Sequence, residues 1–304
     1  MNNRKIKGVI APSLTFFKSN GDVDLKLTGK HMKWMLDSGV NGLFVTGTYG
    51  SGYLMDSNQR KDVYKLALDV VSDCPDAYFI AHVGTNDTAS SVDLAREASR
   101  LNAAAVSAVN PYTFSYSERE LMEYYGELVS AAGDIPVLAY ANPALTGKKM
   151  ELDFLIKLNQ IGVKGIKDSS ADIHLGFDVC HNEFLNKNDF RYIPGTTTNW
   201  LNFRELSLDT FISGACNYIP EVISAFYRIS MSDDRYSAEV AYELINEAIK
   251  KIKYKNSIIS SHFALKARGF DAGFAKRPLI ADYEENEDLI KKIREVIEEV
   301  IEKI

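Results

Sequence analysis

Short apolar runs rich in β-branched residues alternate along the chain with longer stretches of helical periodicity. The apolar runs predict eight strands, at residues 7–11, 42–46, 78–83, 105–109, 137–141, 163–167, 190–193 and 210–213. Each run is followed by a polar or Gly/Pro turn and then by a helical pattern. Near-continuous apolar strands separated by helices are typical of a parallel sheet whose outer side is covered. Eight such units in about 225 residues favour an α/β fold of the closed (β/α)8 TIM barrel type over an open doubly wound sheet.

Two predicted helix ends share one pattern, at Gly39-Val40-Asn41-Gly42 and Gly162-Val163-Lys164-Gly165. The first glycine of each can adopt the left-handed conformation that ends a helix. The second glycine allows the backbone to approach closely where the next strand begins. At the start of the second helix, Asp56-Ser57-Asn58-Gln59 predicts a capping box in which the first and last residues cap each other's backbone.

The strand signals stop after about Glu221, and the remaining sequence is helical in pattern. Helices are predicted at residues 237–254, 257–268 and 286–304. The last carries one apolar stripe, formed by Leu289, Ile290, Ile293, Val296, Ile297, Val300 and Ile301. We therefore expect a barrel with the active site at residues 1–224 and a C-terminal helical region packed on the barrel at residues 225–304.

The chain has 304 residues and a net charge of −6 at pH 7, which argues against nucleic-acid binding because that function normally needs a basic face. Cys74, Cys180 and Cys216 form no Cys-x-x-Cys motif, so reduced thiols are favoured over a zinc site or a reactive thiol. Residues 1–7 are polar, and no apolar run approaches the ~20 residues of a membrane span. These features predict a cytoplasmic protein without a signal peptide or a membrane partner.

Active sites of such barrels lie at the carboxyl ends of the strands, and two strand ends carry candidate chemistry. Lys167 ends an apolar strand, where burial would lower the pKa of its amine and make the neutral nucleophile available. Tyr140 ends the neighbouring strand, so its phenol would lie within reach of the same substrate and could transfer protons. The alternative for each is structural: a lysine whose amine reaches solvent, and a core tyrosine with a satisfied hydroxyl.

A glycine-flanked turn, Gly47-Thr48-Tyr49-Gly50, follows the second strand. Its successive N–H groups could point into one concavity and bind an anion, with the hydroxyl of Thr48 as a further donor. A carboxylate would fit there without a basic side chain, although similar turns occur on many barrels without this role. Asp168 could serve as a base, but strand alternation points it away from the barrel interior, so we favour a structural role.

Taken together, the motifs resemble the dihydrodipicolinate synthase/N-acetylneuraminate lyase family of class I pyruvate aldolases. The matching pieces are Gly47-Thr48-Tyr49-Gly50, Tyr140-Ala141-Asn142-Pro143 and Gly165-Ile166-Lys167-Asp168, in order and spacing. The resemblance covers essentially the whole chain. Within the family, the chain looks most like the archaeal 2-keto-3-deoxygluconate aldolases, partly through residues 216–222, Ser260-Ser261 and Arg277-Pro278.

The resemblance implies that Lys167 forms a Schiff base with pyruvate and that Tyr140 relays protons. It also implies that Thr48 and the N–H of Tyr49 hold the pyruvate carboxylate, so the expected catalytic residues are Lys167, Tyr140 and Thr48. Further substrate-binding positions are expected at Gly47, Gly195, Ala215 and Asn217. The implied activity is that of a lyase of carbohydrate metabolism, of the Entner–Doudoroff type, which reversibly cleaves 2-keto-3-deoxygluconate to pyruvate and glyceraldehyde. It needs no cofactor and no metal, and the implied assembly is a homotetramer.

Departures from the family pattern bear on the substrate. Tyr49 stands where the family usually has Thr, which keeps the backbone donors but adds a bulky phenol. Thr113 replaces the second Tyr of a Pro-Tyr-Tyr motif, so that residue's proton-relay role is not transferred to it. Leu145 stands where dihydrodipicolinate synthases carry an arginine that binds a second carboxylate. Phe114-Ser115-Tyr116 lacks the arginine of dual-specificity members, which favours an unphosphorylated substrate over the 6-phosphate.

Three other reactions could use the same lysine imine: N-acetylneuraminate cleavage, dihydrodipicolinate synthesis, and dehydration of a keto-deoxy sugar acid. A hypothesis of another class is a barrel that binds a keto acid without turnover. A metal-dependent aldolase is less favoured, because the histidines show no pair with ligand spacing. They are His31, His82, His174, His181 and His262.

Overall fold

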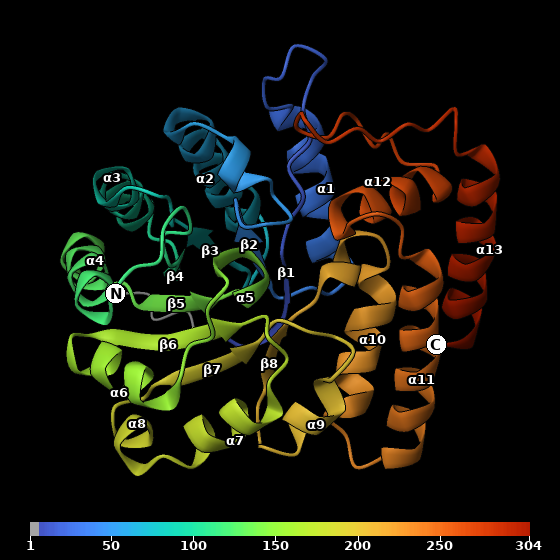
Figure 1. Cartoon of the computed structure of the whole chain (residues 1–304). Helices are drawn as coiled ribbons and strands as arrows, with labels where there is room; N and C mark the ends of the chain where they lie inside the picture. Colours follow the sequence, from blue (N-terminus) through green and yellow to red (C-terminus); the bar gives the residue numbers. More distant parts are fainter. Residues whose placement is uncertain (1–5) are drawn as a thin grey trace. The chain divides into compact units, whose positions relative to one another are not determined.

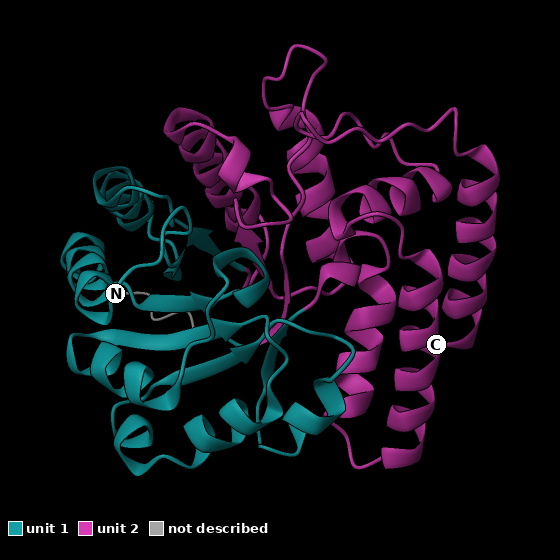
Figure 2. Cartoon of the chain, in the orientation of Figure 1, with its two compact units in different colours: residues 1–7, 78–212 teal, residues 8–77, 213–304 magenta. Residues whose placement is uncertain are grey.

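The computed structural model describes residues 6–304. The chain divides into two compact units, coloured separately in Figure 2. Unit 1 consists of residues 1–7 and 78–212, and unit 2 consists of residues 8–77 and 213–304. The polar start predicted at residues 1–7 lies mostly outside the described residues. The predicted boundary at residue 224 stays a prediction, and it falls within a helix that spans Pro220–Ser230.

All eight predicted strands are present, and each of their ends lies within one residue of the predicted position. They are β1 (Gly8–Ala11), β2 (Gly42–Val45), β3 (Tyr78–His82), β4 (Ala105–Val109), β5 (Val137–Ala141), β6 (Val163–Asp168), β7 (Arg191–Pro194) and β8 (Thr210–Ile212). Almost every strand residue is buried. This explains the continuous apolar runs in the sequence, because both faces of such strands are covered.

Unit 1 contains β3 to β8 and the helices between them. Strands β3 to β7 lie side by side in chain order, and every pair among them is parallel. The helices are α3 (Thr88–Arg100), α4 (Glu118–Ala132), α5 (Pro143–Thr146), α6 (Leu152–Gln160), α7 (Ile173–His181), α8 (Glu183–Lys187) and α9 (Trp200–Arg204). In Figure 1, α3 and α4 lie to the left of β4, and α6 and α7 lie below β6 and β7. Helices of this kind return the chain between parallel strands.

Unit 2 contains the parallel pair β1 and β2 together with the remaining helices. The helices are α1 (Leu25–Asp37), α2 (Ser57–Ser72), α10 (Pro220–Ser230), α11 (Arg235–Ile252), α12 (Ser257–Ala267) and α13 (Glu287–Lys303), with short 3-10 helices η1 (Gly52–Leu54) and η2 (Gly214–Asn217). The three predicted C-terminal helices are therefore confirmed as α11, α12 and α13. In Figure 1, α10, α11 and α13 lie next to one another.

The predicted stripe of the last helix is divided in the structure. Ile290, Ile293, Ile297 and Val300 are buried, whereas Leu289 and Val296 are only half-buried and Ile301 is exposed. The buried residues recur every three or four positions, the spacing of one face of a helix. The centre of the predicted stripe is therefore buried in the core of unit 2, and the residues at its edges remain in contact with solvent.

The local signals at helix ends are mostly confirmed. Gly39 and Gly162 have φ values of 95° and 105°, the left-handed region in which a side chain is strained. A Cβ on Gly165 would lie 2.6 Å from the carbonyl oxygen of Arg191, so only glycine fits there. Asp56 caps α2 by accepting the N–H of Gln59. The reciprocal half of the capping box was wrong.

The side chain of Gln59 has other partners that compete for it. Its amide nitrogen donates to the carbonyl oxygen of Gly21 at 3.3 Å, and its oxygen accepts the amine of Lys276 at 3.1 Å. A charged donor binds an amide oxygen more strongly than a backbone N–H does. These tertiary contacts therefore replace the local bond that the four-residue motif predicted.

Candidate active site

Lys167 and Tyr140 lie opposite one another on the adjacent parallel strands β6 and β5. Both residues stand near the carboxyl ends of their strands, and their side chains are almost completely buried, with exposed fractions of 4% and 3%. Residues paired in a parallel ladder point to the same face of the sheet. The expectation that the amine and the phenol reach the same height on one face therefore matches the structure.

An irregularity at the start of β6 sets this alignment. Val137 pairs with Val163, but the next residue, Leu138, pairs with Gly165, so Lys164 is skipped. With regular pairing, Tyr140 would stand opposite Ile166 instead of Lys167. A bulge of this kind adds one residue to a strand and re-aims every side chain that follows.

The environment of Lys167 lowers the pKa of its amine. Burial is the main cause, because the protonated form loses hydration, and the neighbouring Tyr140 works in the opposite direction. The amine nitrogen lies 3.8 Å from the centroid of the Tyr140 ring, a cation–π distance. The site thus holds an amine whose neutral form is easier to reach than that of a surface lysine, beside a group that can donate or accept a proton.

Two polar side chains surround Tyr140 that the sequence did not single out for this role. Asn142 donates from its amide nitrogen to the Tyr140 hydroxyl at 3.3 Å. His82, fully buried at the end of β3, packs its ring edge against the Tyr140 ring with centroids 5.7 Å apart. The Nε2 atom of His82 accepts the N–H of Val109 at 3.4 Å. The position of His82 at a strand end was the available signal.

Asp168, which follows Lys167, is fully buried and takes part in a hydrogen-bond network. Its carboxylate accepts the hydroxyl of Tyr192 at 2.5 Å, and the N–H and hydroxyl of Ser170, each at 2.8 Å. The carbonyl oxygen of Asp168 accepts the N–H of Gly195 at 2.6 Å. These bonds tie the end of β6 to β7 and to the loop that follows β6, which agrees with a structural role.

In unit 2, the turn at residues 46–52 folds tightly on itself. The N–H of Gly52 donates to the carbonyl oxygen of Gly47, and a Cβ on Gly52 would lie only 1.8 Å from the carbonyl oxygen of Thr46. Thr46 has a φ of 54°, which is strained for a β-branched residue. Such strain persists only where the surroundings enforce it, and it is frequent in binding turns.

The predicted anion-binding residues occupy the centre of this turn. Thr48 and Tyr49 are half-buried, and Gly50 is buried. The hydroxyls of Thr48 and Tyr53 lie 3.2 Å apart. Within residues 6–304, no acceptor takes the N–H of Gly50. A buried N–H without a protein acceptor is unusual, and it is the kind of donor that an anion can use.

The other predicted substrate-binding positions are buried or crowded. The side chain of Asn217 is fully buried and bonded: its oxygen accepts the N–H of Leu14 at 2.9 Å, and its nitrogen donates to the carbonyl oxygens of Pro12 and Gly214, both at 3.0 Å. Ala215 is buried in η2. Gly195 has no room for a side chain, because a Cβ would lie 2.7 Å from the Ser169 hydroxyl. Substrate contact at these positions stays a prediction.

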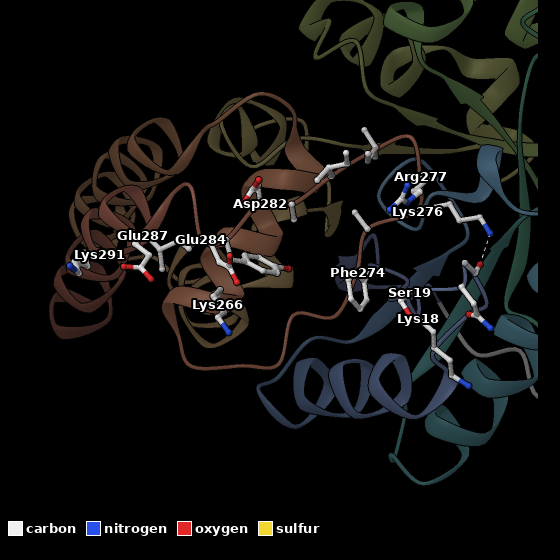
Figure 3. Close-up of a pocket in the computed structure, with 18 of the residues that line it drawn as sticks. Lys18, Ser19, Lys266, Phe274, Lys276, Arg277, Asp282, Glu284, Glu287 and Lys291 are labelled. Carbon is white, nitrogen blue, oxygen red and sulfur yellow. Dashed lines mark hydrogen bonds between the residues drawn. The ribbon is translucent and has the colours of Figure 1, made fainter.

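A cavity of about 910 Å³ opens in unit 2, bordered by residues 18–21, the segment 274–284 and α13 (Figure 3). Lys276 crosses one end, and its amine donates to the carbonyl oxygen of Gly21 at 2.7 Å. None of the predicted site residues lines this cavity. The candidate site is therefore identified by its side chains and not by the size of a cavity.

Two further findings concern residues 6–304 as a whole. No helix among them is both long and apolar enough to cross a membrane. Nor do these residues bring three or more His, Cys, Asp or Glu side chains together in a group that could hold a metal ion.

Comparison with known proteins places the chain among relatives. The model of the dihydrodipicolinate synthetase family matches residues 5–297. An uncharacterized DapA-like lyase of Halobacterium salinarum is 30% identical over 279 residues, which cover 90% of this chain and 88% of the relative.

Solved structures show the same fold over the full length. The sialic acid aldolase of Ruminococcus gnavus, as a catalytic lysine mutant, has a TM-score of 0.89 at 21% identity, covering 100% of this chain and 99% of that one. A variant of the 2-keto-3-deoxygluconate aldolase of Sulfolobus solfataricus has a TM-score of 0.87 at 24% identity, covering 97% and 98%. The predicted (β/α)8 barrel fold is confirmed. The chain belongs to the dihydrodipicolinate synthetase family and is a pyruvate-dependent lyase that acts on carbon–carbon bonds.

Proposed function

We propose that the chain is a Schiff-base aldolase that reversibly cleaves 2-keto-3-deoxygluconate to pyruvate and glyceraldehyde, with Lys167 as the nucleophile. One observation carries this proposal. The amine of Lys167 is buried, its pKa is lowered by that burial, and it lies 3.8 Å from the centre of the Tyr140 ring. Burial of an amine destabilises a fold, because its charged form loses hydration, so its presence at a strand end is best explained by chemistry.

In the proposed reaction, the neutral amine of Lys167 attacks the C2 ketone, and loss of water leaves an iminium. Tyr140 donates its proton to the hydroxyl that leaves as water and, as the phenolate, then takes the proton of the 4-hydroxyl. The C3–C4 bond then breaks, and its electron pair moves toward the iminium. Glyceraldehyde is released, and the pyruvate-derived enamine stays bound to the lysine. Protonation at C3 and addition of water release pyruvate and restore the amine. The iminium is the electron sink for the bond cleavage.

The substrate carboxylate needs hydrogen-bond donors. Uncharged donors suit this role, because they add no second positive charge near the amine of Lys167. We assign this role to the hydroxyl of Thr48 and the N–H of Tyr49, in the turn at residues 46–52. The support is the strained Thr46 backbone and the glycine packing that hold the turn in one conformation. Backbone donors fixed in this way are already oriented before the anion binds.

An unphosphorylated sugar acid is favoured as the substrate. Leu145, which is half-buried in α5, supplies no charge for a second carboxylate. Phe114-Ser115-Tyr116 supplies no guanidinium for a phosphate. The likeness to the 2-keto-3-deoxygluconate aldolase of Sulfolobus solfataricus agrees with this choice.

A second candidate is cleavage of N-acetylneuraminate on the same imine. The likeness to the sialic acid aldolase of Ruminococcus gnavus favours it, and Leu145 is compatible with both substrates. Product analysis with each acid separates the two, because glyceraldehyde and N-acetylmannosamine are readily distinguished.

The proposed function is tested by trapping and by turnover. Pyruvate with borohydride should label Lys167 irreversibly, as read by peptide mass spectrometry, and the label should be absent in Lys167→Ala. The matched control is Lys164→Ala, three residues earlier on the same strand and exposed. Turnover of 2-keto-3-deoxygluconate should exceed that of its 6-phosphate. A protein that binds pyruvate without label or turnover would instead be a non-catalytic keto-acid binder.

A further inference from the structure

The aromatic ring of Tyr49 lies directly on the backbone of Gly214, at the start of η2. A Cβ built on Gly214 would come 2.0 Å from the Tyr49 hydroxyl oxygen and 2.4 Å from its Cζ atom. Both distances are far below any non-bonded contact, so the space that a side chain at 214 would need is filled by this ring. Tyr49 and Gly214 are therefore sterically matched.

The surface under the ring is firmly held. The amide nitrogen of Asn217 donates to the carbonyl oxygen of Gly214 at 3.0 Å. The same side chain also bonds Pro12 and Leu14, and the carbonyl oxygen of Asn217 lies 2.8 Å from Nε2 of the buried His31. A fully satisfied buried amide is costly to displace. The ring of Tyr49 thus rests on a backbone segment that the hydrogen bonds of Asn217 hold in place.

A buried tyrosine also adjoins this contact. Tyr218, one residue beyond η2, is only 5% exposed. Burial raises the pKa of its phenol, and the proximity of Tyr49 raises it further. The phenols of Tyr49 and Tyr218 are therefore close enough to interact electrostatically.

We propose that Tyr49 is a positioning residue: its ring, seated on Gly214, holds the turn at residues 46–52 so that the N–H of Tyr49 stays oriented toward the substrate carboxylate. This inference rests on the proposed function, which gives that N–H its role. The ring acts as an anchor for its own backbone, one residue after Thr48 in the turn. Threonine at position 49 has no ring to reach Gly214, so the anchor is specific to this chain's pair of residues.

The test is a double-mutant cycle on Tyr49 and Gly214. Gly214→Ala should drive the ring from its seat and raise the KM for pyruvate by about tenfold or more, with a smaller effect on kcat, since displacement of a binding group by about 1 Å has effects of this order. Tyr49→Thr should raise the same KM. In the Tyr49→Thr background, Gly214→Ala should have no further effect, because the added methyl group enters the space that the ring has left.

The matched control is Gly126→Ala in α4, where a Cβ would meet nothing within 4 Å. This variant should leave the KM for pyruvate unchanged. If Gly214→Ala raises KM equally in the Tyr49 and Thr backgrounds, or leaves it unchanged in the parent, the positioning role is refuted. If Gly214→Ala does not fold, Tyr49→Thr and the double variant decide the question. A normal KM for pyruvate in Tyr49→Thr refutes the positioning role. A KM that is higher in the double variant than in Tyr49→Thr also refutes it.

The borohydride label separates this inference from the proposed function. Parent protein that forms no pyruvate adduct at Lys167 refutes the proposed function, whatever the cycle shows. Parent protein that forms the adduct, with no coupling between Tyr49 and Gly214, refutes only the positioning role.

Discussion

The candidate residues fall into two parts, one in each unit, and the two parts are built in different ways. In unit 1, the amine of Lys167 and the phenol of Tyr140 stand on paired strands, so their alignment follows from hydrogen-bond register and burial. In unit 2, Thr48 and Tyr49 stand on a turn, whose shape depends on close glycine contacts. Strand register is all-or-none, whereas a turn can shift by fractions of an ångström. Changes to the first part should therefore abolish chemistry, and changes to the second should weaken binding.

The largest effect is expected from shifting the register of β6 after its bulge. Insertion of one alanine between Gly165 and Ile166 would place Tyr140 opposite Ile166 and turn the amine of Lys167 to the other face. We expect aldol cleavage to fall by at least about 10⁴-fold, the order of losing a covalent catalytic group. Cleavage rate and borohydride labelling are the measurements.

Lys164→Ala is the control for this insertion, because it changes an exposed side chain of the same strand and keeps the residue count. It should retain activity within about twofold, as surface substitutions usually do. Circular dichroism separates a refolded register from an unfolded chain. A folded insertion variant with normal labelling of Lys167 would show that register does not control the amine.

A smaller loss is expected for Tyr140→Phe, which keeps the ring and removes the hydroxyl. The ring still packs against the Lys167 amine and His82, but the proton carrier is lost. We expect kcat to fall by about 10²–10⁴-fold, the contribution of general acid–base catalysis. Pyruvate should still label Lys167. Asn142→Ala, which removes the donor to that hydroxyl, should cost less than Tyr140→Phe, and an equal or larger loss would contradict the assigned roles.

On the turn, Thr48→Val removes one hydroxyl and keeps the shape of the side chain. The expected result is a rise in the KM for pyruvate of about 10–150-fold, equivalent to about 1.5–3 kcal/mol for one hydrogen bond to a charged group. Steady-state kinetics of the condensation direction measure it. Thr85→Val, on the loop after β3, is the control with the same chemical change. A fall in kcat as large as that of Tyr140→Phe would argue against a pure binding role.

The smallest effect concerns stability, because the buried amine of Lys167 should lower the free energy of unfolding. Because the pKa of Lys167 is lowered in the folded state, the unfolded chain binds more protons, and stability rises as pH increases through the folded pKa. Lys167→Met should therefore raise Tm at pH 7 by about 2–4 °C, the shift that about 1 kcal/mol produces in a large domain. Near pH 10 the gain should shrink. Lys164→Met should change nothing, and a lower Tm for Lys167→Met at both pH values would show the amine to be stabilising.

Much of the frame was predictable from the sequence, because patterns of apolar residues report burial directly. The eight strands, and the positions of Tyr140 and Lys167 near the ends of neighbouring strands, followed from strand order and length. The bulge at Lys164 was not predictable, since one polar residue inside an apolar run gives no sign of which neighbour it will skip. The register that aligns the two groups is a property of two strands together, and neither strand encodes it alone.

Contacts between distant segments were also beyond the sequence. The motif around Tyr49 predicted backbone donors but gave no role for the ring, because its partner Gly214 lies in another part of the chain. Gln59 failed as a capping residue for the same reason, since Gly21 and Lys276 take its side chain. Local motifs predict local bonds, and they miss a residue that finds a better partner after folding.

The hydrogen bonds of Asp168 fix β6, the strand that carries Lys167, on the face opposite the amine. Because side chains alternate along a strand, the carboxylate is directed away from the face that presents Lys167, toward Tyr192 and Ser170. In the proposed reaction, each cycle makes and breaks covalent bonds at the end of a long, flexible side chain, so the backbone that carries it has to stay fixed. The two faces of β6 therefore have different roles. In a redesign for new aldehydes, the face that carries Lys167 can be altered around the amine, whereas the face that carries Asp168 has to be kept.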